Sequence, residues 1–270
     1  MLKKIAAVLL FLLVFPVSVA AETLVLLHGY LANADYWRQT GITQVLVRNA
    51  WLDAGTLRTT ANGIRADRPV PGSNRRFYTL ELPSEAALMV QLRYLEKYLD
   101  FVQKQHPYES LILSGHSAGG VLARLYMVKH PDVSIGALIT FASPHLGTDS
   151  AEIGALAGNS PLGLFAPLLG GGTLNRSQGL YQDLVRERPG SLLFWLNHQE
   201  HPSSRYISVV REGGGLLGFG DLLVPAWSQD MNQVDALRGR ANKIVTPSGH
   251  GLSERDGELL LRILSSQSQV

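Results

Sequence analysis

The chain contains no cysteine among its 270 residues. This absence excludes disulfide bridges, thiolate nucleophiles, zinc sites built on cysteine, haem attachment and a lipid anchor on an N-terminal cysteine. The fold must therefore rest on its hydrophobic core, and this length is enough for one domain with a sizeable core. A repeat at fixed spacing, a Gly-X-Y period and a heptad run are also missing, which excludes solenoid, collagen-like and coiled-coil architectures.

The chain also has only a small excess of charge of either sign. Lys plus Arg number 24 against 22 for Asp plus Glu, a formal net charge of +2. The excess lies in Lys3 and Lys4, which open a basic start followed by an apolar run over residues 5–15 and by small residues at 18–21. This run is shorter than the roughly 20 residues that span a bilayer. We therefore expect residues 1–21 to be a signal peptide that directs the protein to the periplasm or outside the cell.

The expected mature chain carries 22 basic and 22 acidic residues. This balance gives no reason to expect a nucleic acid or an anionic surface as partner. Because no later stretch reaches 18 consecutive apolar residues, we also expect no integral membrane span in the mature chain.

Short apolar runs alternate with helical patterns along the chain. The runs that predict buried strands are 23–27, 77–82, 111–113, 135–142, 206–210 and 243–246. One helix is predicted from apolar residues at three-to-four spacing between Leu88 and Val102, with Ser84 as its N-cap, and others over 118–130 and 254–264. Apolar strands separated by helices predict an α/β fold with a mostly parallel sheet covered on both faces.

Two stretches do not follow this alternation. Residues 40–76 give no clear pattern and stay unassigned. Residues 149–200 contain a triple glycine at 170–172 and prolines at 161, 167 and 189, so we interpret them as an insertion over one end of the sheet. Their apolar part, 156–174, fits a lid over an acyl pocket and fits equally well residues that pack the insertion onto the core.

The motif Gly115-His116-Ser117-Ala118-Gly119-Gly120 stands between a predicted strand and a predicted helix. A serine on such a sharp turn takes a strained backbone conformation that exposes its hydroxyl, and only small neighbours tolerate the turn. The alternative is an ordinary glycine-rich loop. The strand–turn–helix context favours a nucleophilic serine at Ser117.

A serine hydroxyl needs a base, and that base needs an acid to orient it. His250 follows the last predicted strand between glycines and is the preferred base, with His201 as the alternative. Asp221 joins a glycine-rich loop to an apolar run and is the preferred acid, with Asp230 and Asp235 as competitors.

Negative charge develops on the substrate oxygen during attack, so hydrogen-bond donors must converge there. The backbone N–H of Ala118, at a helix N-terminus, is one candidate. The N–H of Tyr30, in the turn after the first predicted strand, is the other; a turn that merely ends the strand is the alternative reading.

These motifs together resemble the α/β-hydrolase superfamily, and within it the lipase-like serine esterases of triacylglycerol lipase type. The matching segments are 26–30, 115–120, 141–148, 220–225 and 248–250. The resemblance implies an α/β-hydrolase domain over 22–270, with a cap or lid insertion at about 149–200. It implies a catalytic triad of Ser117, Asp221 and His250 and an oxyanion hole of the Tyr30 and Ala118 amides. Some similar proteins hold a structural calcium, but no convincing aspartate cluster appears, and we expect neither a metal nor a cofactor.

The expected activity is cleavage of carboxylic esters, small or lipid-like, through an acyl-enzyme on Ser117, with transient contact to a lipid interface. Phospholipase, thioesterase or acyltransferase activity on the same scaffold is an alternative. A non-catalytic, lipid-binding or partner-binding protein is a further alternative, because a fold does not fix a function.

Overall fold

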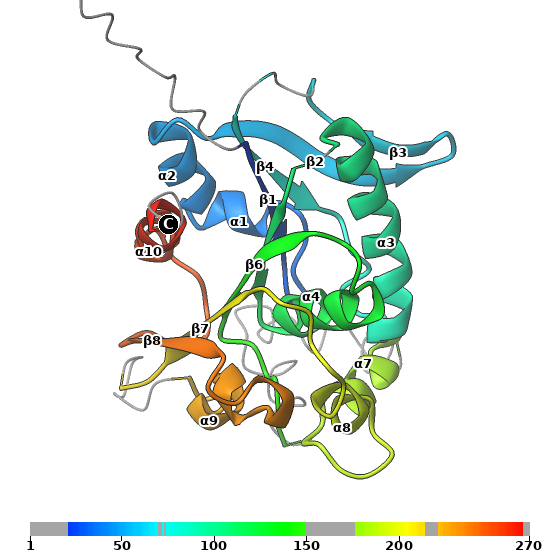
Figure 1. Ribbon diagram of the computed structural model, residues 1–270, viewed down its shortest axis with the longest axis vertical. Helices are drawn as coiled ribbons and strands as arrows, with labels where there is room; N and C mark the ends of the chain where they lie inside the picture. Colours follow the sequence, from blue (N-terminus) through cyan, green and yellow to red (C-terminus); the bar gives the residue numbers. More distant parts are fainter. Residues whose placement is uncertain are drawn as a thin grey trace, which may run out of the picture.

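The computed structural model describes residues 21–69, 72, 74–107, 109–149, 176–213 and 221–266 (Figure 1). All but the last residue of the expected signal peptide and residues 150–175 of the expected insertion lie outside this part of the chain. Within the described ranges, no helix combines the length and the apolar character needed to cross a membrane.

An eight-stranded sheet forms the centre of the fold, in the order β3-β2-β4-β1-β5-β6-β7-β8. The strands are β1 (Glu22–Leu27), β2 (Leu52–Thr60), β3 (Gly63–Ala66), β4 (Arg75–Leu80), β5 (Leu111–His116), β6 (Ile135–Phe141), β7 (Arg205–Arg211) and β8 (Ala241–Thr246). Only the edge strand β3 pairs antiparallel, with β2; every other neighbouring pair is parallel. The mostly parallel sheet predicted from the sequence is therefore confirmed.

Helices cover both faces of this sheet, as Figure 1 shows. On one face, α1 (Tyr36–Gln39), α2 (Ile42–Arg48) and α10 (Glu254–Ser265) enclose a core with apolar side chains of the central strands. On the other, α3 (Leu88–Gln105), α4 (Ala118–Lys129), α7 (Gln178–Leu184) and α8 (Leu192–Asn197) enclose a second core. The short α9 (Ala226–Gln229) and the 3-10 turns η2 (Met231–Gln233) and η3 (Asp235–Leu237) lie between β7 and β8.

Each predicted strand and helix exists, with ends that differ by up to three residues. The unassigned stretch 40–76 holds α2, β2, β3 and the start of β4. Both new strands carry polar residues among their apolar ones, and β2 is interrupted by an irregularity between Asp53 and Thr56. A run of uniformly apolar residues, which identifies the central strands, is therefore missing at this edge of the sheet.

The predicted N-cap of α3 is wrong. The helix begins at Leu88, and Ala87, not Ser84, stands at the cap position without a side-chain hydrogen bond. The missing acceptor comes from α7, because the Leu88 N–H donates to Oδ2 of Asp183 at 2.7 Å. Burial raises the pKa of this carboxyl. A residue 95 positions away thus satisfies one of the free amides at the start of the helix.

The described part of the expected insertion packs onto the core. Leu180 and Leu184 of α7 and Leu193 and Leu196 of α8 are buried in the same cluster as the apolar residues of α3 and α4. These residues follow the apolar stretch 156–174, to which both the lid interpretation and the packing interpretation apply. The apolar stretch 156–174, on which the lid interpretation depends, lies outside the described residues.

Replacing Asp183 tests this cap across the two helices. Asp183→Ala should lower the free energy of unfolding by about 1 kcal/mol, since caps of this kind contribute roughly 0.5–2 kcal/mol. Asp183→Asn keeps an oxygen acceptor and should lose less. Urea unfolding of the three proteins measures the difference, and equal stability of Asp183→Ala and wild type would contradict the assignment.

Candidate active site

Ser117 occupies a strained turn between β5 and α4. Its φ is 52° and its ψ is −128°, a region that non-glycine residues avoid and that costs of the order of 1–3 kcal/mol. Its N–H donates to the carbonyl oxygen of Phe141 at 2.9 Å, which ties the turn to the end of β6. The strained conformation that the motif predicts is therefore confirmed.

The glycines of the motif are needed because backbone segments come very close here. A Cβ on Gly115 would lie 2.4 Å from Cα of Gly120, and one on Gly119 would lie 2.5 Å from the carbonyl oxygen of His28. Real Cβ atoms essentially never approach so closely, and backbone atoms cannot move aside as the end of a flexible side chain can. Glycine at these positions thus lets α4 begin against β5 and the loop after β1.

The structure brings Ser117, His250 and Asp221 together in one chain of hydrogen bonds. Nδ1 of His250 lies 2.7 Å from Oδ2 of Asp221, and its Nε2 lies 3.1 Å from Oγ of Ser117. A carboxylate only accepts, so Nδ1 carries the proton and the lone pair of Nε2 faces the serine hydroxyl. The Asp221 side chain is fully buried and that of His250 is 14% exposed. This arrangement suits proton transfer from a serine to a histidine.

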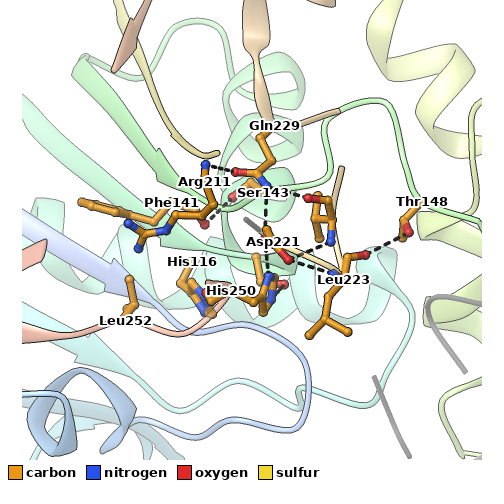
Figure 2. Close-up of polar contacts among 12 residues, drawn as sticks. His116, Phe141, Ser143, Thr148, Arg211, Asp221, Leu223, Gln229, His250 and Leu252 are labelled. Carbon is orange, nitrogen blue, oxygen red and sulfur yellow. Dashed lines mark hydrogen bonds and ion pairs between the residues drawn. The ribbon is translucent and has the colours of Figure 1, made fainter. Parts of the chain in front are cut away.

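The Asp221 carboxylate is held from several sides (Figure 2). Oδ1 accepts the N–H groups of Leu223 and Val224 at 2.8 and 3.0 Å, and Oδ2 accepts the side-chain amide of Gln229 at 3.1 Å. The same amide nitrogen donates to the Val224 carbonyl, while Oε1 of Gln229 accepts the N–H of Arg211. With His250, the carboxylate therefore has four hydrogen-bond donors, which fix its orientation.

The alternative base and acids lie elsewhere. Nδ1 of His201 donates to the carbonyl of Gln199, and its ring packs edge-on against Tyr206. Asp230 caps η2 through the Asn232 N–H, and the exposed Asp235 pairs with Arg238. None of the three has a contact with Ser117 or His250 among the described residues.

Both predicted amide donors adjoin Ser117. Ala118 follows it directly and is the first residue of α4, so its N–H has no carbonyl partner within the helix. Tyr30 lines the same cavity as Ser117, and the preceding Gly29 lies so close that a Cβ there would be 2.8 Å from Cβ of Ser117. This placement suits two donors for an oxyanion.

The side chain of Tyr30 connects this loop to α7. Its hydroxyl donates to Oγ of Ser177 at 3.1 Å and lies 2.6 Å from the hydroxyl of Tyr181. The two tyrosine rings meet edge to face, with centroids 5.6 Å apart, and burial raises the pKa of Tyr30. These contacts hold α7 beside Ser117.

A narrow cavity of about 10 Å³ adjoins Ser117. Its wall is mostly apolar and is formed by Tyr30, Ser117, Pro144, Thr148, Leu180, Tyr181, Leu184 and Val224. Within the described ranges, no three His, Asp or Glu side chains gather closely enough to hold a metal ion.

Sequence reasoning missed Gln229 and the role of His116 at this site. Gln229 lies in a polar stretch with no motif, so nothing in the sequence marks it. His116 stands inside the motif 115–120, where the pattern indicates only a residue of the turn. In the structure its Nε2 lies 2.8 Å from the main-chain carbonyl of His250.

Several histidines are kept neutral by burial. The pKa of His201 is lowered to about 3, first by burial and then by the neighbouring Arg124 guanidinium. Burial likewise lowers the pKa of Arg124 to about 9 and holds that of His145 well below its ordinary value. Below pH 6.5 the unfolded chain binds a proton at residue 201 that the folded chain excludes, so folding stability falls as the pH falls from about 6.5 toward 3.

His201→Asn tests this effect, because its amide can replace the donor to Gln199. Between pH 6 and pH 4 the unfolding free energy of the wild type should fall more steeply than that of the variant. The difference should approach about 1.4 kcal/mol per pH unit, the value for one proton. Denaturant titrations at several pH values measure it, with the exposed His198 changed to Asn as control. Parallel curves for wild type and His201→Asn would refute the burial effect.

Comparison with known proteins identifies the fold family. A family model of the alpha/beta hydrolase fold matches residues 22–160. A search of curated proteins finds no match. The chain is similar to the solved structure of the lin2722 product of Listeria innocua, with 14% identity and a TM-score of 0.59 over 91% of this chain and 92% of that one. It is also similar to Bacillus licheniformis lipase BlEst2 in its mature form, with 15% identity and a TM-score of 0.53 over 93% of each chain. A third similar structure is a membrane phospholipase A, with 14% identity and a TM-score of 0.59 over 93% of this chain and 80% of that one. At these identities the likeness concerns the fold alone. By its family match and its fold, the chain belongs to the alpha/beta hydrolase family.

Proposed function

We propose that this hydrolase-fold protein is an exported serine esterase that cleaves carboxylic esters through an acyl-enzyme on Ser117. The observation that carries the proposal is the continuous hydrogen-bonded path from Oγ of Ser117 through His250 to Asp221. Export rests on the signal-peptide pattern of residues 1–21.

The reaction follows from this geometry. As Oγ of Ser117 attacks the ester carbonyl carbon, Nε2 of His250 takes the hydroxyl proton, and Asp221 stabilises the resulting imidazolium. The N–H groups of Tyr30 and Ala118 donate hydrogen bonds to the former carbonyl oxygen, which carries the negative charge. The intermediate collapses, the C–O bond breaks, and the alcohol leaves with the proton from His250. Water then attacks the acyl-enzyme with His250 again as base, which releases the carboxylic acid and restores Ser117.

The mostly apolar residues that surround Ser117 support an acyl group as the part of the substrate that lies against them. The apolar stretch 156–174 supports a lipid-like ester and transient contact with a lipid interface. The likeness to a lipase and to a phospholipase A fits both a simple ester and a phospholipid. Phospholipase, thioesterase and acyltransferase activities on the same scaffold are therefore alternatives to the esterase. A non-catalytic lipid-binding protein is a further alternative.

Ser117→Ala tests the nucleophile. The wild type should hydrolyse p-nitrophenyl esters in a series from acetate to palmitate and should react covalently with a fluorophosphonate. Ser117→Ala should lose at least about a thousandfold in kcat and should not be labelled, because the acyl-enzyme cannot form. Ser134→Ala, an exposed serine, serves as the matched control.

The outcomes separate the functional classes. Activity that persists in Ser117→Ala would refute the mechanism. A wild type that is neither active nor labelled would favour the binding protein. Labelling without ester hydrolysis, together with turnover of phospholipid vesicles, of an acyl thioester or of an acyl acceptor other than water, would identify one of the related activities.

Asp221→Asn tests the acid. An asparagine at this position would favour the wrong tautomer of His250, so kcat should fall by roughly four orders of magnitude while the fold is retained. Asp230→Asn is the matched control, since Asp230 is also buried but does not contact His250. Full activity of Asp221→Asn, measured with p-nitrophenyl butyrate, would transfer the role to another acid.

A further inference from the structure

Side chains of two other elements form hydrogen bonds with main-chain groups of the loop that carries His250. Nε2 of His116 bonds the carbonyl oxygen of His250 at 2.8 Å, and the N–H of Leu252 donates to the hydroxyl of Tyr36 at 3.1 Å. His116 ends β5, whereas Tyr36 begins α1. Both ends of a three-residue segment are therefore fixed by residues that are distant in the chain.

The three rings also pack against one another. The centroids of His116 and His250 are 5.0 Å apart, and those of His116 and Tyr36 are 5.3 Å apart. His116 thus lies between the tyrosine and the base of the proposed triad, and Figure 2 shows it beside His250. A ring in this place restricts the movement of the His250 imidazole on one side.

The protonation of His116 follows from its partners. A carbonyl oxygen only accepts, so the proton of His116 is on Nε2. Its Nδ1 is buried and has no hydrogen-bond partner among the described residues. Burial, the nearby His250 and the Arg211 guanidinium hold the pKa of His116 well below its ordinary value. His116 is therefore a neutral imidazole with a fixed tautomer.

This donor does not lie on the proton path. The proton of Ser117 moves to Nε2 of His250, whereas His116 bonds the main-chain carbonyl of that residue. A positive charge on His250 during the reaction disfavours a second charge on His116. The contact can therefore act on the position of His250 without exchanging a proton with it.

We propose that His116 is a positioning residue of the hydrolase: the hydrogen bond from its Nε2–H to the carbonyl of His250, together with that between Tyr36 and the Leu252 N–H, holds His250 where its Nε2 faces Oγ of Ser117. The inference rests on the proposed function, since positioning matters only if His250 is the base. The motif 115–120 thereby contributes the proposed nucleophile and, one residue earlier, a support for the proposed base.

Two substitutions separate the hydrogen bond from the packing. His116→Phe keeps a ring of similar shape without a donor, and His116→Gln offers an amide nitrogen three bonds from Cβ, as Nε2 is in histidine, without a ring. With p-nitrophenyl butyrate, His116→Phe should lose roughly tenfold to hundredfold in kcat with little change in KM, because misplacement of a catalytic group by about 1 Å costs up to a hundredfold. Its fluorophosphonate labelling should slow in parallel. His116→Gln should recover most of the loss.

Thermal unfolding and a second variant keep the test decisive. If His116→Phe does not fold, Tyr36→Phe takes its place: it keeps the ring but removes the acceptor of the Leu252 N–H, and kcat should fall several-fold with KM unchanged. Tyr206→Phe is its control, since that hydroxyl donates to the carbonyl of Pro202, away from Ser117.

A folded His116→Phe with wild-type kcat, or a His116→Gln no more active than His116→Phe, would overturn the proposal. In either case a wild type that hydrolyses esters and is labelled leaves the proposed function standing. A wild type that does neither refutes the proposed function itself.

Discussion

The close backbone packing around Ser117 is the constraint on which the rest of the site depends. The positive φ of Ser117 is unfavourable for a non-glycine residue. This conformation persists because β5, α4 and the loop after β1 fix the neighbouring residues on each side. Packing of this kind leaves no room for a side chain at Gly115 or Gly119. The position of the Ser117 hydroxyl is consequently fixed, and the other residues of the site must be brought to it by their own loops.

The order of the strands places the other groups of the site at different distances from Ser117. The loop with Tyr30 follows β1, which is next to β5, so it adjoins Ser117 directly. His250 follows β8, which lies three strands from β5, a separation of about 14 Å at the usual spacing between strands. The segment with His250 must therefore extend back across the ends of β7 and β6. Contacts from His116 and Tyr36 supply the support that such an extended segment lacks by itself.

Buried polar groups fix the region behind the site. Arg211 and Asp256, whose side chains are 0% and 4% exposed, form an ion pair at 2.8 Å, and Asp256 also accepts the N–H of Ser253 at the start of α10. Breaking such a pair leaves an uncompensated buried charge, which costs roughly 3–5 kcal/mol. The main-chain N–H of Arg211 also bonds Gln229, which in turn bonds Asp221. Arg211 thus contributes both to the buried ion pair and, through Gln229, to the orientation of the Asp221 carboxylate.

Local patterns of residues were enough to predict the central strands and the three long helices, and to select the candidate site residues Ser117, Asp221, His250, Tyr30 and Ala118. They were enough because buried parallel strands are uniformly apolar and because a sharp strand-to-helix turn requires glycine. The tertiary structure alone decided the edge strands β2 and β3, the cap of α3 by Asp183, and the contacts of Gln229 and His116. Each of these depends on a partner distant in the chain, and no local pattern of residues records which distant groups the fold brings within hydrogen-bonding distance.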